Sequence, residues 1–337
     1  QKTPEDDERE AHDRELRDNP PRDDDLGPAV QFEGDDPYSQ QNHIYDKSRP
    51  ENLDFLRKLR TLMDKYPGTF TLGEIGDDHP YERTVEYTGA GLLNTCYNTQ
   101  LMSGKHKELT ADFIREPLEK FAELSDGNWP SWAFSNHDVV RTASRWLPDS
   151  DGFSHDPDCA KMLIALLTCL RGTTFLYQGE ELGLPEAKLN FEDLQDPWGK
   201  HLWPEWQGRD GCRTPLPWTD NKPEKAWLPM SDDHLALAVE AQQRNPESVL
   251  NFTKEFLNFR NENRALQHGQ LNFQDSANNQ IMFERCLGQN HILCAFNLTD
   301  QPQHLQMPML GDPQTLFAQN FDGKTLERFG FALLEIE

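Results

Sequence analysis

The chain has 337 residues, and its 58 Asp and Glu against 33 Lys and Arg give a formal net charge of −25. Such an excess of negative charge repels phosphate backbones and anionic membrane surfaces, which argues against nucleic-acid and membrane partners. No apolar run is long enough to cross a bilayer, and no signal peptide opens the sequence. We therefore expect a cytoplasmic protein with neutral substrates, built as one large domain and a smaller one.

The six cysteines, at positions 96, 159, 169, 212, 286 and 294, include no CxxC pair. They also form no cluster with histidines at the spacing of zinc ligands. We interpret them as free structural thiols in a reducing compartment. The sequence accordingly predicts neither a metal site nor a cofactor.

Residues 1–37 are dense in Asp, Glu, Arg and Pro, so we expect a poorly ordered charged loop there. A first domain is predicted over residues 38–266. Its first helix, over residues 52–64, carries Leu and Met on one face. A short buried strand over residues 69–75 follows, and it delivers Glu74 at its end.

Strands and helices then alternate along the chain. The apolar pattern predicts strands over residues 92–102, 132–135 and 173–177 and helices over residues 110–124 and 159–170. Alternation of this kind predicts a parallel sheet, and polar side chains at the ends of strands are typical of a (β/α) barrel. The predicted class is therefore α/β.

A long excursion over residues 183–246 is rich in Trp, Pro and charge and shows no clear periodicity. An amphipathic helix over residues 249–260 closes the first domain. Short alternating segments over residues 280–285, 292–298 and 331–336 then predict a small antiparallel β domain over residues 267–337.

Two acidic side chains at predicted strand ends suggest catalysis. A glutamic acid held partly out of water has a raised pKa and can protonate a leaving oxygen, which suits Glu74. A surface salt bridge is the simpler alternative for this residue.

The second acid belongs to a predicted turn. Three hydrogen-bonding side chains meet at one point there, as sugar recognition needs: Asn136, His137 and Asp138. Their simpler alternative is a turn in which Asn136 and Asp138 cap the next helix.

From about residue 12 to the C-terminus the chain resembles the α-amylase superfamily of retaining glycoside hydrolases (family 13), most of all its bacterial α-glucosidase branch. The resemblance implies the C-terminal half of a (β/α)8 TIM barrel, strands five to eight, followed by the β domain. Five segments in the family order carry it: Pro50-Glu51-Asn52-Leu53, Gly73-Glu74-Ile75, Phe134-Ser135-Asn136-His137-Asp138, Tyr177-Gln178-Gly179-Glu180-Glu181-Leu182-Gly183 and Arg209-Asp210-Gly211-Cys212-Arg213-Thr214-Pro215.

The resemblance also implies roles for four residues. Glu74 matches the general acid/base, and Asp138 matches the acid that grips the distorted sugar and stabilises the transition state. His137 matches a histidine that hydrogen-bonds the same ring. Arg213 resembles the arginine that holds the non-reducing glucose, although it could instead anchor the excursion. The implied reaction is release of glucose from short α-glucosides or oligosaccharides, without a cofactor.

The retaining mechanism also needs a carboxylate nucleophile about 5 Å from the acid. By spacing Glu5 falls near its place, but Pro4 and the flanking charges argue against a buried strand there. We therefore expect this chain to lack the nucleophile strand and the first half barrel, and to hydrolyse α-glucosides at least roughly a thousandfold more slowly than a complete relative.

Four strands cannot close the barrel, so we expect an open half barrel or another polypeptide that covers its edges. A non-catalytic fragment or interaction protein is the main alternative function. A metal hydrolase is disfavoured because the sequence contains no HExxH motif or paired ligand spacing.

Overall fold

The structure is a computed structural model that describes residues 41–102, 108–125, 127–147, 152–277, 279–306 and 313–336. The predicted charged loop and Glu5 lie outside these residues. The chain divides into two compact units. The first unit comprises Gln1–Thr99 and Lys120–Asn128, and the second comprises Gln100–Glu119 and Trp129–Glu337.

In the first unit a short parallel strand pair carries the Glu74 segment. Strand β1 (Leu72–Gly73) pairs with β2 (Thr95–Asn98), and Gly73 lies opposite Cys96. A Cβ at Gly73 would lie 2.5 Å from the Cys96 Sγ, so only glycine allows this close approach. Strand β1 is much shorter than the strand expected over residues 69–75.

Two helices accompany this pair, α2 (Pro50–Met63) and α3 (Pro80–Tyr87). Each begins with a proline in the first turn, where the missing N–H costs no intrahelical hydrogen bond. Helix α2 confirms the helix expected over residues 52–64, whereas α3 was not predicted. The buried side chains that form the core of this unit are Leu56, Ile75, Tyr87, Leu92 and Cys96.

After β2 come η2 (Thr99–Met102) and α4 (Ala111–Leu124), which confirms the helix expected over residues 110–124.

The second unit contains a βαβ arrangement. Strands β3 (Ser131–Ala133) and β4 (Thr173–Phe175) pair in parallel. Between them run α5 (Thr142–Arg145) and α6 (Pro157–Cys169), and residues 159–169 of α6 are all buried. The Asp156 carboxylate caps α6 by accepting the N–H groups of residues 158 and 159.

The excursion consists of short helices and irregular chain, as its lack of periodicity indicated. Helix η3 (Glu180–Leu182) directly precedes it, and the excursion contains η4 (Phe191–Asp193), α7 (Pro197–Leu202), η5 (Asp210–Cys212), α8 (Asp232–Ala236) and α9 (Val239–Gln243). It has a small core of its own, formed by Ala187, Leu189, Leu194 and Leu228. Helices α10 (Val249–Glu262) and α11 (Arg264–His268) follow, and Ser248 caps α10.

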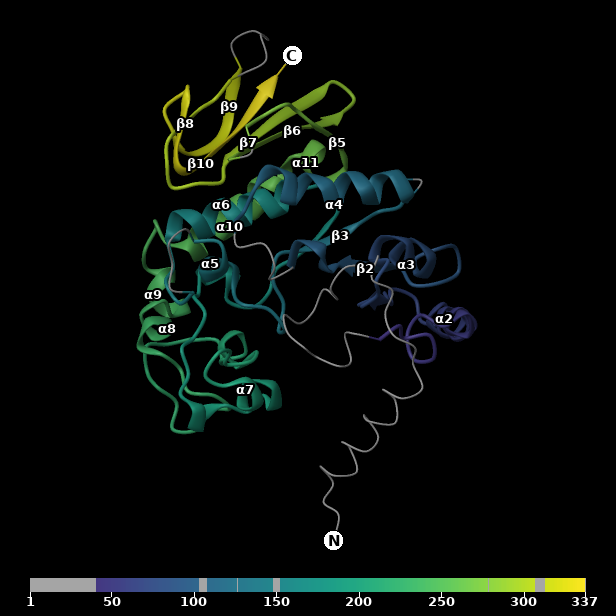
Figure 1. Cartoon of the computed structure of the whole chain (residues 1–337). Coiled ribbons are helices and arrows are strands. Elements are labelled where there is room, and N and C mark those ends of the chain that lie inside the picture. Colours follow the sequence, from purple (N-terminus) through teal and green to yellow (C-terminus); the bar gives the residue numbers. More distant parts are fainter. Residues whose placement is uncertain are drawn as a thin grey trace. The chain divides into compact units, whose positions relative to one another are not determined.

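The C-terminal residues form one antiparallel sheet (Figure 1). Its order is β5-β6-β7-β10-β8, and β9 also pairs with β10. The strands are β5 (Gln270–Phe273), β6 (Gln280–Leu287), β7 (Asn290–Asn297), β8 (Gln303–His304), β9 (Gln314–Phe321) and β10 (Thr325–Ile336). Strands β5, β8 and β9 were not predicted, but the predicted antiparallel β domain is confirmed.

Aromatic side chains join this sheet to α10. Phe252 and Phe256 of α10 contact Phe317 of β9 and Phe331 of β10, with ring centroids 5.0–6.1 Å apart and near-perpendicular planes. Edge-to-face contacts of this kind stabilise a core beyond the area that they bury.

The parallel pairs followed by helices and the antiparallel sheet confirm the predicted α/β class with part of a (β/α) barrel. The domain boundary between residues 266 and 267 stays a prediction. Within the described ranges, no helix combines the length and apolar character needed to span a bilayer.

Candidate active site

The turn that follows β3 presents Asn136, His137 and Asp138. The Asp138 N–H donates to the Asn136 Oδ1 at 2.8 Å, which fixes the turn locally. Helix α5 begins after Arg141 without a side-chain cap. The capping alternative for Asn136 and Asp138 is therefore wrong, and the Asp138 carboxylate is used elsewhere.

Two arginines hold the Asp138 carboxylate. Its Oδ1 accepts from the Arg213 Nη2 at 2.7 Å and from the Arg209 Nη1 at 3.1 Å. Its Oδ2 lies 3.5 Å from the His137 Nε2. The Arg213 Nε also donates to the His137 carbonyl at 2.7 Å. Because charge-assisted hydrogen bonds are strong and directional, Asp138 has a fixed orientation while its side chain stays 32% exposed.

Asp196 in turn orients Arg209. Its carboxylate accepts from the Arg209 Nε at 2.9 Å and from the Arg209 Nη2 at 3.1 Å, and its side chain is fully buried (0%). Burial favours the neutral acid, but the hydrogen bonds from Arg209 and from the Trp198 N–H outweigh it and lower the pKa of Asp196. Asp210 supports this arrangement, since its Oδ2 accepts the backbone N–H groups of Gln195 and Asp196 at 2.6 and 2.7 Å.

The one-turn helix η5 sets the spacing of the two arginines, which flank it at positions 209 and 213. Its last carbonyl, that of Cys212, accepts from the Arg141 Nη2 at 2.9 Å and from the Tyr177 hydroxyl at 3.1 Å. A Cβ at Gly211 would lie 2.1 Å from the Glu186 Oε1, so this position requires glycine. The Arg213 N–H donates to the Asp210 carbonyl at 3.0 Å, so Arg213 is anchored through its backbone as well as its side chain.

The half-buried Arg145 contacts the backbone at both ends of the turn. Arg145 donates to the carbonyl of Phe134, before the turn, and to that of Val140, after it. Burial lowers the pKa of Arg145 to about 10, and the nearby carboxylates of Glu180 and Glu186 oppose that shift.

Glu180 and Glu186 are both buried. The Glu180 Oε2 accepts the Tyr177 N–H at 2.7 Å, and the Glu186 Oε2 accepts the Arg141 N–H at 3.0 Å. Burial raises the pKa of each to about 7, although these hydrogen bonds and the nearby guanidinium groups lower it. Glu180 thus holds the backbone that follows β4, and Glu186 holds the backbone directly before α5.

The second unit thus brings together three of the four residues that the sequence singled out: Asp138, His137 and Arg213. Glu74 belongs to the first unit, where it directly follows β1 and is exposed. It is not held partly out of water within that unit. Sequence reasoning gave no role to Arg209 and Asp196. The Asp196-Pro197 pair at a helix start and the Arg209–Arg213 spacing were the available signals.

Comparison with known proteins identifies the lineage. A family model for the α-amylase catalytic domain matches residues 11–269. A probable α-glucosidase of Rhizobium meliloti is 42% identical over 88% of this chain and 54% of its own length. Maltase A1 of Drosophila melanogaster is 27% identical over 74% of this chain and 44% of its own length.

Solved structures agree with this result. The crystal structure of an α-glucosyl transfer enzyme, XgtA, is 39% identical, with a TM-score of 0.85 over 95% of this chain and 60% of that one. The isomaltulose synthase of Erwinia rhapontici, at 21% identity and a TM-score of 0.74, shares the fold.

The fold and the comparisons together define an α/β protein with part of a (β/α) barrel. The chain belongs to the α-amylase catalytic-domain family. It spans about half the length of the curated relatives that it matches.

Proposed function

We propose that this chain contributes to an α-glucosidase-type active site that releases glucose from short α-glucosides with retention of configuration. The observation that carries the proposal is the Asp138 carboxylate, fixed at a strand end by Arg209 and Arg213. The similarity to a probable α-glucosidase supports the substrate class.

The two carboxylate oxygens of Asp138 have different contacts and therefore different proposed roles. Both arginines donate to Oδ1, so Oδ2, beside the exposed His137 ring, is the oxygen that would accept hydroxyl groups of a sugar. Hydrogen bonds to sugar hydroxyls that strengthen in an oxocarbenium-like transition state accelerate the reaction. Arg213 acts by holding Asp138 and the His137 carbonyl, which modifies its expected role of holding the glucose itself.

We propose Glu74 as the general acid/base of the same reaction. Its place directly after β1 matches that role in the family segment Gly73-Glu74-Ile75. We assign no nucleophile among the described residues. A polypeptide that adds strands beside the parallel pairs would complete the barrel. The six free cysteines support a cytoplasmic location.

Hydrolysis of p-nitrophenyl α-glucoside tests the proposal. Glu74→Gln and Asp138→Asn should each lower kcat/KM at least about a hundredfold, since each removes a group that acts in the transition state. Asp232→Asn, at an exposed surface ion pair with Lys222, is the matched control and should leave kcat/KM unchanged. Full activity in Asp138→Asn would overturn the assignment.

Glucosyl transfer is a second candidate, favoured by the similarity to the α-glucosyl transfer enzyme. An alcohol that takes the place of water at the same site would receive the glucosyl group. Turnover of maltose in the presence of an excess alcohol acceptor distinguishes the two reactions. A new glucoside indicates transfer, whereas free glucose alone indicates hydrolysis.

A further inference from the structure

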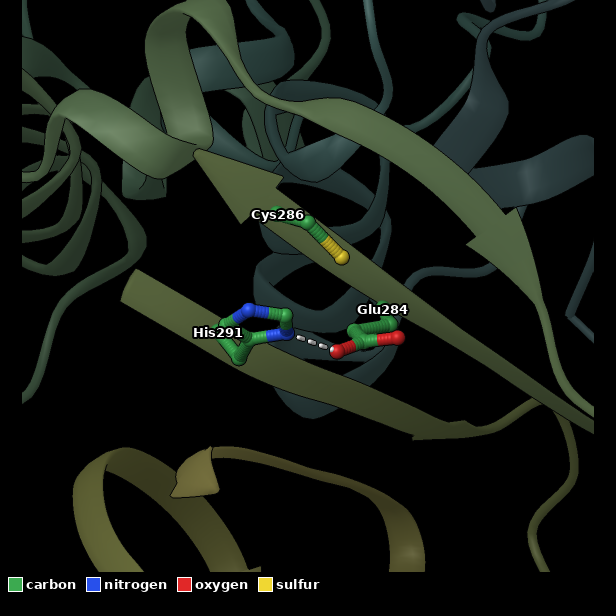
Figure 2. Close-up of side chains that lie close together, drawn as sticks. All are labelled: Glu284, Cys286 and His291. Atoms are coloured by element: carbon green, nitrogen blue, oxygen red, sulfur yellow. Dashed lines mark hydrogen bonds and ion pairs between the residues drawn. The ribbon is translucent and has the colours of Figure 1, made fainter. Parts of the chain in front are cut away.

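Three side chains that can ligate a metal ion converge on the hairpin of β6 and β7. Cys286 of β6 lies directly opposite His291 of β7 in the antiparallel register. Glu284 is two residues before Cys286, so it projects from the same face of the sheet. The Glu284 oxygen, Cys286 sulfur and His291 nitrogen all lie within 4.8 Å of one another, and Figure 2 shows the three side chains turned toward a common point.

The groups around this cluster hold its members in position. The Glu284 Oε1 and the His291 Nδ1 are 2.5 Å apart, and the His291 Nε2 lies 3.2 Å from the Gly288 carbonyl. Because two acceptors would repel each other at 2.5 Å, the His291 Nδ1–H donates to the Glu284 carboxylate in the metal-free protein. Loss of this proton turns the Nδ1 lone pair toward Glu284 and Cys286, while Nε2–H keeps its contact with the Gly288 carbonyl. The Asn272 amide of β5 donates to the Cys286 Sγ at 3.5 Å. Second partners of this kind commonly orient metal ligands.

The cluster is also reachable from solvent. The side chains of His291 and Glu284 are 35% and 17% exposed. Of the six cysteines, all in the described part of the chain, Cys286 is half-buried and the other five are buried. An ion can therefore enter this cluster and keep a water molecule as a further ligand.

We propose that Glu284, Cys286 and His291 form a zinc-binding site that cross-links the end of the β6–β7 hairpin. Zinc accepts one thiolate, one imidazole and one carboxylate with a water molecule as the fourth, tetrahedral ligand. Magnesium and calcium prefer all-oxygen sites, so the sulfur and nitrogen donors disfavour them. On binding, the Cys286 thiol and the His291 Nδ1–H each give up a proton to solvent, and the zinc ion takes the place of the hydrogen bond between His291 and Glu284.

In the simpler alternative, Glu284 and His291 form only a hydrogen-bonded pair, and Cys286 takes no part in binding. The two alternatives differ in the role of the Cys286 sulfur. A zinc site needs the Cys286 thiolate, whereas the pair does not. Binding should also stabilise the folded protein, because a ligand that binds only the native state shifts the unfolding equilibrium.

Cobalt(II) is a spectroscopic probe for such a site. We expect one equivalent of Co²⁺ per chain to produce a thiolate-to-cobalt charge-transfer band, and one equivalent of Zn²⁺ to abolish it. Titration calorimetry with Zn²⁺ should show one-to-one binding, and Zn²⁺ should raise the Tm above its value in a chelator.

Cys286→Ser and His291→Ala should each weaken Zn²⁺ binding at least about tenfold and remove the rise in Tm. Cys286→Ser should also remove the cobalt band. The matched control is His304→Asn at an exposed histidine of β8, which should bind as the parent does. Circular dichroism in chelator checks that each variant folds. A parent chain without the band, or a Cys286→Ser variant with parental affinity, would overturn the site.

Discussion

The Arg213 Nη2 lies 2.7 Å from the Asp138 Oδ1, and the Nε of the same guanidinium donates to the His137 carbonyl. One planar group thus fixes both the carboxylate and the backbone of the turn. Lysine cannot reproduce this geometry, because its three donors all lie on one nitrogen, whereas the guanidinium group uses two separate nitrogens.

We therefore expect Arg213→Lys to lower kcat/KM for p-nitrophenyl α-glucoside by about ten- to a hundredfold, equivalent to about 1.4–2.7 kcal/mol. Arg244→Lys, at the exposed pair with Glu240, is the control and should have no effect. Parental kcat/KM in Arg213→Lys would show that the paired contacts of the Arg213 Nη2 and Nε are unimportant for the reaction.

Asp196→Asn tests the chain of contacts that orients Arg209. The change keeps the side-chain shape but removes the charge that holds a guanidinium at 2.9 and 3.1 Å. We expect a loss of about 2 kcal/mol in the free energy of unfolding, because a buried charge-assisted hydrogen-bond network is broken. Urea denaturation measures this change in the free energy of unfolding, with Asp232→Asn as the surface control. An unchanged transition midpoint would contradict a positioning role for Asp196.

Glu180 and Glu186 predict a specific pH dependence of stability. Burial raises each pKa from its ordinary value of 4.5 to about 7, so the folded state binds these protons more tightly than the unfolded chain does. Their contribution to stability is complete below pH 4.5 and is lost as the pH rises to about 7.

Glu186→Gln keeps an acceptor for the Arg141 N–H and removes the titration. Its free energy of unfolding relative to the parent should rise between pH 5 and pH 8 by roughly 1–3 kcal/mol. The control is Glu240→Gln at the surface. A constant difference between parent and Glu186→Gln over this range would show that Glu186 does not titrate there.

Gly73→Ala tests the close pairing that positions the Glu74 segment. The added methyl group would lie 2.5 Å from the Cys96 Sγ and 2.7 Å from the Leu93 Cδ1. We expect a destabilisation of about 1–3 kcal/mol from overpacking. Gly76→Ala is the matched control, since a Cβ there has no neighbour within 4 Å. Equal thermal stability of the two variants would contradict this packing.

Much of the fold was predictable, since one-sided apolar periodicity marked α4 and α10 and a nearly continuous apolar run marked α6. Strand β1 was predicted too long because Phe70, an apolar residue within the predicted range, is exposed in the structure and lies outside the strand. Strand β9 was missed because its intermediate burial leaves no clean alternation. Helix α3 was missed because only Tyr81, Thr84 and Tyr87 of its eight residues are buried.

The site was predictable only in part. Asp138, His137 and Arg213 were marked by short motifs, but Asp196 acts through Arg209, 13 residues further along an irregular segment. Linear spacing could not reveal that contact. The cluster of Cys286 and His291 was missed for the same reason, because strand register rather than a CxxC-type motif brings them together.

The central claim is that Asp138 is the sugar-binding carboxylate of this chain, and calorimetric titration with maltose tests it most directly. The parent and the Asp232→Asn control should bind maltose with equal affinity, whereas Asp138→Asn should bind it at least about tenfold more weakly, a difference of 1.4 kcal/mol or more. Equal affinity in the parent and Asp138→Asn, or no maltose binding by the parent, would contradict the account.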